Sequence, residues 1–84
     1  MDEFASLIRD IPDFPEPGVV FKDITPILGH ADTFARLVSA MADPFRDKGV
    51  TQVAGIEARG FTLAAPIALE LNAGFIPIRK PGKL

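Results

Sequence analysis

The sequence predicts an α/β fold whose central feature is one strand–helix–strand unit of a parallel sheet. Two short apolar runs, residues 53–56 and 75–78, have the length and composition of buried strands. Residues 61–71 between them are rich in Ala and Leu, and Pro66 alone interrupts the helical pattern. Because strands joined by a helical crossover lie parallel with a right-handed connection, we expect the two strands to be parallel neighbours.

The length of the chain limits how complete this fold can be. Eighty-four residues suffice for one small domain or for part of one. Parallel sheets need cover on both faces, so we expect a sheet of two strands to be an incomplete one. We divide the chain into residues 1–31, a helix followed by a proline-rich segment, and residues 32–84, the first part of an α/β core.

The composition excludes several classes of protein. No cysteine is present, which rules out disulfides and thiolate metal sites and suits a reducing cytoplasm. A net charge of −2 gives no reason to expect nucleic acid as a partner. Residues 61–78 are largely apolar, but Pro66, Glu70, Asn72 and Pro77 interrupt them, so we expect no contact with a membrane.

The first third of the chain begins with a predicted short helix. Apolar residues recur at intervals of three and four from Phe4 to Ile11, which predicts a helix over residues 2–10. Pro12 ends this helix, and the four prolines from Pro12 to Pro26, both included, predict an extended, stiff segment. Its apolar centre, residues 18–21, belongs either to a packed connector or to the wall of a ligand pocket.

A second helix follows, with Asp32 as its predicted N-cap and residues 48–49 as its predicted end. Pro44 is expected to kink its last turns. One apolar stripe assigns this helix to packing: Phe34, Leu37, Val38, Met41 and Phe45. The single histidine, His30, has no carboxylate or second histidine near it in sequence, so we assign it no function.

Charged residues follow both predicted strands of the parallel unit. After the first strand, Glu57 and Arg59 lie in the turn that leads into the helix, where free backbone N–H groups favour an anion. Arg59 can grip two phosphate oxygens, and Gly60 lacks the Cβ that would block a close approach. After the second strand, residues 79–83 add three more cations. The alternative for the first segment is an ordinary turn with an exposed ion pair, and the alternative for the second is a solvated basic tail.

Ligands of open α/β sheets bind beyond the carboxyl ends of the strands, where both charged segments are expected. Three motifs in order also resemble adenine phosphoribosyltransferases, in register over residues 8–84. The turn around Arg59 is similar to the pyrophosphate loop of that family, and the flanking motifs are similar to its N-terminal segment and to its next strand and basic turn. In chain order the motifs are Ile11-Pro12-Asp13-Phe14-Pro15 with Pro17 to Leu28, Gly55 to Phe61, and Ala73 to Leu84.

The resemblance implies a phosphoribosyltransferase-type fold in which residues 1–31 include a hood that binds adenine. It implies that Val20 and Lys22 offer backbone groups to the edge of the base and that Phe21 stacks on its face, although Phe21 as plain core is the competing interpretation. The same resemblance assigns the pyrophosphate of phosphoribosyl pyrophosphate to Glu57, Ala58, Arg59, Gly60, Arg79, Lys80 and Lys83. It also implies a cis peptide between Glu57 and Ala58.

The implied reaction converts adenine and phosphoribosyl pyrophosphate to AMP and pyrophosphate, with Mg²⁺ carried by the diphosphate. A homodimer is implied too, in which the residue matching Arg79 reaches across the interface. Two parts of the family pattern have no counterpart here: the acidic ribose-phosphate loop and the mobile loop whose carboxylate protonates the base. We therefore expect no catalytic residue and no metal ligand within these 84 residues, and no activity from them alone. Two alternatives stay open. The protein is a non-catalytic regulator that binds purine or phosphoribosyl ligands, or it is a piece that folds only with a missing half.

Overall fold

The computed structural model describes residues 2–83; Met1 and Leu84, the outer ends of the two predicted divisions, lie outside the described residues. The chain forms two compact units, one ending at Leu37 and one beginning at Val38, and each is described by itself. The predicted division between residues 31 and 32 separates a base-binding segment from the α/β core, and it stays a prediction. In chain order the elements are α1 (Asp2–Ala5), β1 (Arg9–Pro12), β2 (Val20–Asp23), α2 (Thr25–Leu28), α3 (Ala31–Ala42), the 3-10 helix η1 (Asp43–Phe45), β3 (Gln52–Ile56), α4 (Glu57–Glu70) and β4 (Gly74–Ile78).

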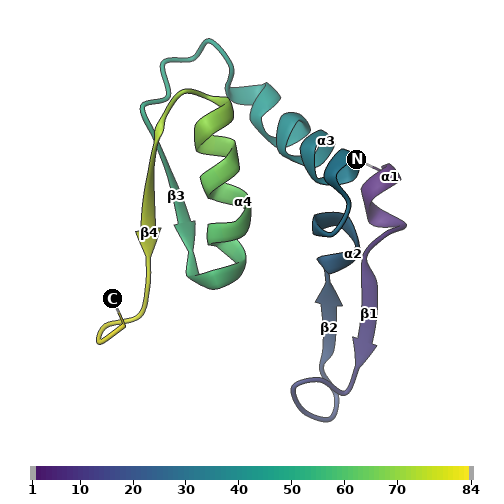
Figure 1. The fold of residues 1–84 in the computed structure, drawn as a ribbon. Helices are drawn as coiled ribbons and strands as arrows, with labels where there is room; N and C mark the ends of the chain where they lie inside the picture. The colour runs from purple at the N-terminus through teal and green to yellow at the C-terminus, as the bar shows by residue number, and fades with distance from the viewer. Residues whose placement is uncertain (1, 84) are drawn as a thin grey trace. The chain divides into compact units, whose positions relative to one another are not determined.

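The first unit is built on an antiparallel hairpin of β1 and β2 (Figure 1), which the sequence analysis did not predict. The pairing aligns Arg9 with Asp23 and Asp10 with Lys22, so that opposite charges face each other across the strands. The predicted helix over residues 2–10 is therefore wrong beyond Ala5. Apolar spacing could not separate the two structures, because each residue of the strand pairs with one that lies eight to fourteen residues away.

The second predicted helix is shorter than its sequence pattern suggested. The α3 helix begins at Ala31 and ends at Ala42, and Pro44 lies in the separate turn η1 instead of kinking a longer helix. Proline has no N–H for the carbonyl four residues earlier and disfavours helical geometry in the residue before it, so the α-helix stops. Leu37 and Val38 are buried as the stripe predicted, but Phe45 is half exposed.

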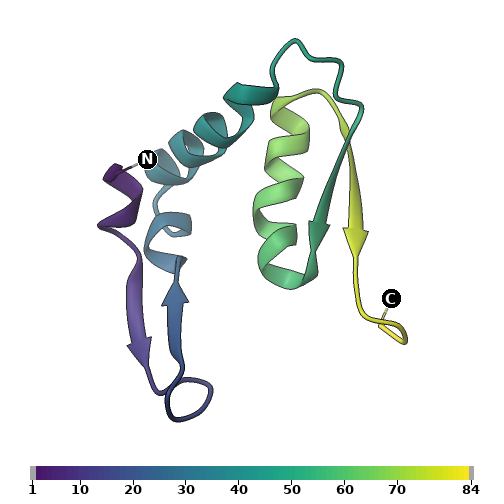
Figure 2. The ribbon, with the colours of Figure 1, turned by 180° about the vertical axis from the view of Figure 1, so that it is seen from behind.

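The second unit is the predicted strand–helix–strand unit. β3 and β4 are parallel, with Gln52 opposite Gly74 and Ile56 opposite Ile78. Figures 1 and 2 show α4 starting where β3 ends and both strands running in the same direction. The helix buries a face of small and apolar residues, namely Ala64, Ile67 and Ala68. None of the helices in residues 2–83 is both long and apolar enough to cross a membrane.

Candidate functional site

The parallel register brings the two charged segments of the sequence to one edge of the β3–β4 sheet. Because Ile56 lies opposite Ile78, the residues that follow them leave neighbouring strands at the same end. Glu57 to Gly60 come directly after β3, and the cations Arg79, Lys80 and Lys83 come after β4. The structure therefore brings together all seven residues predicted for the pyrophosphate.

The turn from β3 into α4 is made by Glu57. Its φ of +57° lies in the left-handed region, which a non-glycine residue adopts at a cost of roughly 1–3 kcal/mol. This one dihedral redirects the chain from strand to helix. The predicted cis bond between Glu57 and Ala58 is wrong. Among residues 2–83 the cis peptide is the one between Phe14 and Pro15. The N-cap residue Ile56 offers no side-chain cap to the first N–H groups of α4, which suits a site for an external anion.

Two glycines allow the helix to begin close against the strand. A Cβ on Gly55 would lie 2.7 Å from the Gly60 carbonyl oxygen and 2.8 Å from Cβ of Ala64. A Cβ on Gly60 would lie 3.2 Å from the carbonyl carbon of Gly55. Gly60 was predicted to allow the close approach of a phosphate, whereas the structure gives both glycines a packing reason that needs no ligand.

The basic segment after β4 forms a tight turn. The Lys83 N–H donates to the Lys80 carbonyl oxygen at 3.2 Å, and Gly82 has a φ of +88°. Pro81 followed by a glycine with positive φ is typical of a type II turn. The turn places one exposed lysine at each of its ends, so the two cations belong to the same turn.

Glu57 connects the two strand ends across the edge of the sheet. Its Oε1 accepts a hydrogen bond of 2.9 Å from the Lys80 backbone N–H, and its Oε2 lies 4.0 Å from Nε of Arg79. The Arg79 guanidinium also lies 5.6 Å from the ring centre of Phe61, which packs edge-on against Phe75. Neither this role of Phe61 nor this bond of Glu57 was predicted from the sequence, although alignment of the two strand ends places Glu57 near residues 79–80.

An open hollow of about 390 Å³ lies beside this cluster, lined by Phe61, Pro77, Arg79 and Lys83. Two of its four lining residues are cations, and the other two are apolar. The hollow therefore offers positive charge next to an apolar wall, which suits an anionic ligand.

The residues predicted for adenine lie together on β2, within the first unit. Val20 and Lys22 alternate along the strand with Phe21, and they pair with Pro12 and Asp10 of β1. Lys22 Nζ lies 2.7 Å from a carboxylate oxygen of Asp10. Phe21 is half buried and packs edge-on against Phe14, with ring centres 5.4 Å apart.

Asp23, which the sequence analysis did not single out, anchors the end of β2. It is 6% exposed and accepts hydrogen bonds from the Thr25 N–H at 3.0 Å, the Thr25 hydroxyl at 2.8 Å and the Arg9 Nη2 at 2.7 Å. The two bonds from Thr25, helped by the Arg9 guanidinium, hold the pKa of Asp23 below its ordinary value. Asp23 thus joins both strands of the hairpin to the start of α2.

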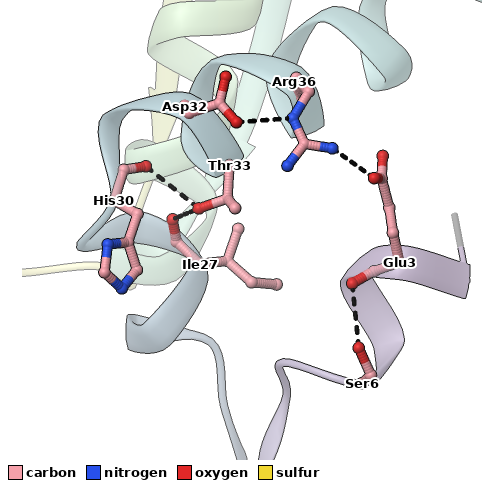
Figure 3. Close-up of polar contacts among 7 residues, drawn as sticks. All are labelled: Glu3, Ser6, Ile27, His30, Asp32, Thr33 and Arg36. Carbon is pink, nitrogen blue, oxygen red and sulfur yellow. Dashed lines mark hydrogen bonds and ion pairs between the residues drawn. The ribbon is translucent and has the colours of Figure 1, made fainter.

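A second polar network holds the helices of the first unit (Figure 3). Arg36 on α3 bonds to Asp32 one turn earlier and to Glu3 on α1, and its guanidinium lies over the Phe4 ring. The Thr33 hydroxyl donates to the carbonyl oxygens of Ile27 and His30. These bonds involve the His30 backbone, so the structure adds no role for the imidazole. The network fixes α1 and α2 on α3, and with them the ends of the hairpin strands.

The second unit is thus a parallel strand–helix–strand module with cations at the carboxyl edge, the arrangement of α/β proteins that bind phosphate groups. No family model matches the chain. The adenine phosphoribosyltransferase of Myxococcus xanthus is 65% identical over 77 residues, which are 92% of this chain and 42% of that protein. The predicted resemblance to adenine phosphoribosyltransferases is therefore confirmed over nearly the whole chain.

Solved structures agree with this comparison. The adenine phosphoribosyltransferase of Rhodothermus marinus has a TM-score of 0.92 at 49% identity, over 99% of this chain and 47% of its own. The Saccharomyces cerevisiae enzyme, solved with an imino-altritol bisphosphate and adenine, has a TM-score of 0.89 at 33% identity, over 99% of this chain and 52% of its own. The predicted fold class is confirmed, and the chain spans about half the length of the proteins that it matches.

Proposed function

We propose that this chain forms the part of an adenine phosphoribosyltransferase that holds adenine and the pyrophosphate end of phosphoribosyl pyrophosphate. The observation that carries the proposal is the register of β3 and β4, which gathers four cations at one sheet edge. These are Arg59, Arg79, Lys80 and Lys83, against one acid, Glu57. The likeness to enzymes of this name supports the choice of substrate.

The pyrophosphate is assigned to the backbone of Ala58 and Gly60 and to the cations around them. The first N–H groups of α4 and the positive end of the helix dipole favour a negative ligand, and the guanidinium of Arg59, an exposed residue, can bond two of its oxygens. Lys80 and Lys83 add charge from their turn. Pyrophosphate becomes a better leaving group as its charge is spread over these cations, so the chain favours breaking of the bond to the sugar.

Adenine is assigned to β2 of the first unit. Val20 lies opposite Pro12, and proline has no N–H to exchange across the ladder. We therefore expect the exchanging pairs at Phe21 and Asp23, with the backbone groups of Val20 and Lys22 turned to the open edge of β2. An open edge of N–H and C=O groups can read a purine without charge, and Phe21 supplies an apolar ring. The adenine in the Saccharomyces cerevisiae structure supports this ligand.

In the proposed transfer, a ring nitrogen of adenine bonds to C1 of the ribose as the bond from C1 to a pyrophosphate oxygen breaks. The oxygen keeps the bonding pair, and the proton of the attacking ring is lost to the surroundings. This chain contributes binding and orientation to that step, which can lower a barrier by about 7–11 kcal/mol in favourable cases. We assign no proton donor or acceptor among residues 2–83.

Mg²⁺ enters the proposal only as an ion bound to the diphosphate of phosphoribosyl pyrophosphate. Residues 2–83 hold no group of three His, Cys, Asp or Glu side chains that could bind a metal ion. Among the described residues of the cationic edge the carboxylate is that of Glu57, which is engaged with Lys80 and Arg79. We therefore propose that the ion arrives on diphosphate oxygens, which suit a hard cation.

A homodimer and a cytoplasmic location complete the proposal. The homodimer comes from the resemblance, and the cytoplasmic location comes from the cysteine-free composition, which suits a reducing compartment. Sedimentation analysis at several protein concentrations tests the dimer, for which the mass should be twice 9.0 kDa for this chain.

Enzyme assays test the activity. The chain is incubated with adenine, phosphoribosyl pyrophosphate and Mg²⁺, alone and with the remainder of the Myxococcus xanthus relative added as a separate polypeptide, and AMP is measured. We expect AMP only in the mixture. AMP from the chain alone at the rate of that whole relative would refute the assignment of catalysis to other residues. Binding of adenine and pyrophosphate with no AMP in any mixture would favour a regulator instead.

A further inference from the structure

Glu57 is an acid in the middle of a cationic site. Its side chain is 37% exposed, and its carboxylate lies where the proposed pyrophosphate would carry several negative charges. Direct contact between two anions opposes binding, so the position needs another explanation. The structure offers one, because both carboxylate oxygens already have partners in the segment after β4. Oε1 accepts from the Lys80 N–H at 2.9 Å, and Oε2 lies 4.0 Å from Nε of Arg79.

We propose that Glu57 is a positioning residue: it fixes the Lys80–Lys83 turn and Arg79 for a polyphosphate anion and does not itself contact the anion. The inference rests on the proposed function, because it concerns the same cationic edge. It replaces the sequence-based assignment of Glu57 to the pyrophosphate with a role that acts through Lys80 and Arg79.

The bond to Lys80 spans the two strands at the point where the site is built. Glu57 is the first residue after β3, and Lys80 is the second after β4, so their bond ties the two segments that carry the cations. Lys80 also accepts the N–H of Lys83. Fixing the Lys80 backbone therefore fixes both ends of the turn and the points from which its two lysine side chains start.

The Arg79 side chain is held from two sides. The Glu57 carboxylate lies near Nε, and the Phe61 ring lies 5.6 Å from the guanidinium carbon. An arginine ordered before the ligand arrives loses less side-chain freedom on binding than a mobile one. Glu57 can thus raise the affinity for an anion even though its own charge opposes that anion.

The backbone of Glu57 supports the same conclusion. A φ of +57° is adopted without strain by glycine, and the turn itself requires nothing from a longer side chain. Glutamate at this position costs backbone strain, so its carboxylate is the feature that offsets the cost.

Three variants separate positioning from the alternatives: Glu57→Gln, Glu57→Ala and Glu57→Gly. The carboxamide oxygen of glutamine can still accept from the Lys80 N–H, while alanine and glycine cannot. Glu57→Gly also removes the backbone strain, so it controls for stability. Glu70→Gln is the matched charge control, because Glu70 lies at the other end of α4 and pairs with Arg46.

Two measurements are made on each variant: pyrophosphate affinity by calorimetry, without Mg²⁺, and hydrogen exchange of the Lys80 amide by NMR. We expect Glu57→Gln to bind pyrophosphate as tightly as the parent or up to about threefold tighter, since a repulsive charge is gone. We expect Glu57→Ala and Glu57→Gly to bind about 5–10-fold more weakly, the loss of one hydrogen bond, with faster exchange at Lys80. Glu70→Gln should match the parent in both measurements.

The proposal is overturned if Glu57→Ala and Glu57→Gly bind pyrophosphate as tightly as the parent, because Glu57 would then only repel the ligand. Equal weakening in Glu57→Gln and Glu57→Ala would also overturn it, since the charge and not the bond to Lys80 would matter. If the parent protects the Lys80 amide but binds no pyrophosphate at all, the proposed function itself fails and the anion role fails with it.

Discussion

Gly55 is the residue whose substitution tests most directly how the candidate site is built. An added Cβ would meet the Gly60 carbonyl oxygen at 2.7 Å and Cβ of Ala64 at 2.8 Å, both closer than real Cβ atoms approach. Neither partner can move away easily, since one is backbone and the other is a buried residue of α4. Inserting a methyl group into such a contact costs about 1–3 kcal/mol, so Gly55→Ala should lower the unfolding free energy by that amount.

The matched control is Gly74→Ala at the start of β4. A Cβ there would meet nothing closer than the Thr51 carbonyl oxygen at 3.8 Å, an ordinary contact. Replacing glycine in a tolerant strand position restricts the unfolded chain, so this variant should be neutral or more stable by about 0.4–1 kcal/mol. Urea unfolding followed by far-UV circular dichroism measures both variants. Equal midpoints for Gly55→Ala and Gly74→Ala would refute the close-packing argument.

Three further predictions concern single side chains. Arg59→Ala should weaken pyrophosphate binding about 10–100-fold, the value of a charge-assisted hydrogen bond, and leave adenine unchanged in calorimetry; equal losses for both ligands would indicate a folding defect. Phe21→Ala should show the opposite bias, with adenine about 2–10-fold weaker and pyrophosphate unchanged; an unchanged adenine affinity would make Phe21 plain core. The lowered pKa of Asp23 stabilises the folded first unit fully above about pH 4, and this stabilisation is lost as the pH falls through the lowered pKa. Asp23→Asn should therefore be less stable than the parent at pH 7 and converge with it toward pH 2 in urea unfolding, and a constant difference across that range would contradict the argument.

The second unit could be predicted because its signals are local. The strands of residues 53–56 and 75–78 are short apolar runs, and the helix between them has a continuous pattern, so each element is visible in its own segment. Parallel pairing then follows from chain connectivity alone. The cations of the site were found for the same reason, since each follows a recognisable strand.

The hairpin and the contacts of Glu57 depend on distant residues and could not be found in the same way. Arg9 and Asp23 are fourteen residues apart, and Glu57 and Lys80 are twenty-three apart. Ile8 and Ile11 fit a helical period as well as they fit a turn and a strand, so their pattern alone did not decide between the two. Only the register of the strands shows which side chains meet, and register is a property of the pair.

Packing and binding are assigned to neighbouring residues of one short turn, which makes the two roles separable. Gly55 and Gly60 face each other between strand and helix, Glu57 reaches toward β4, and the Arg59 side chain is exposed. A change at Arg59 should therefore reduce binding more than stability, and a change at Gly55 should reduce stability first and binding only through a displaced turn. Gly60 belongs to both groups, because its N–H lies in the first turn of α4 and its carbonyl meets Gly55. The ratio of binding loss to stability loss along residues 55, 59 and 60 thus measures how rigidly the anion site is attached to the sheet.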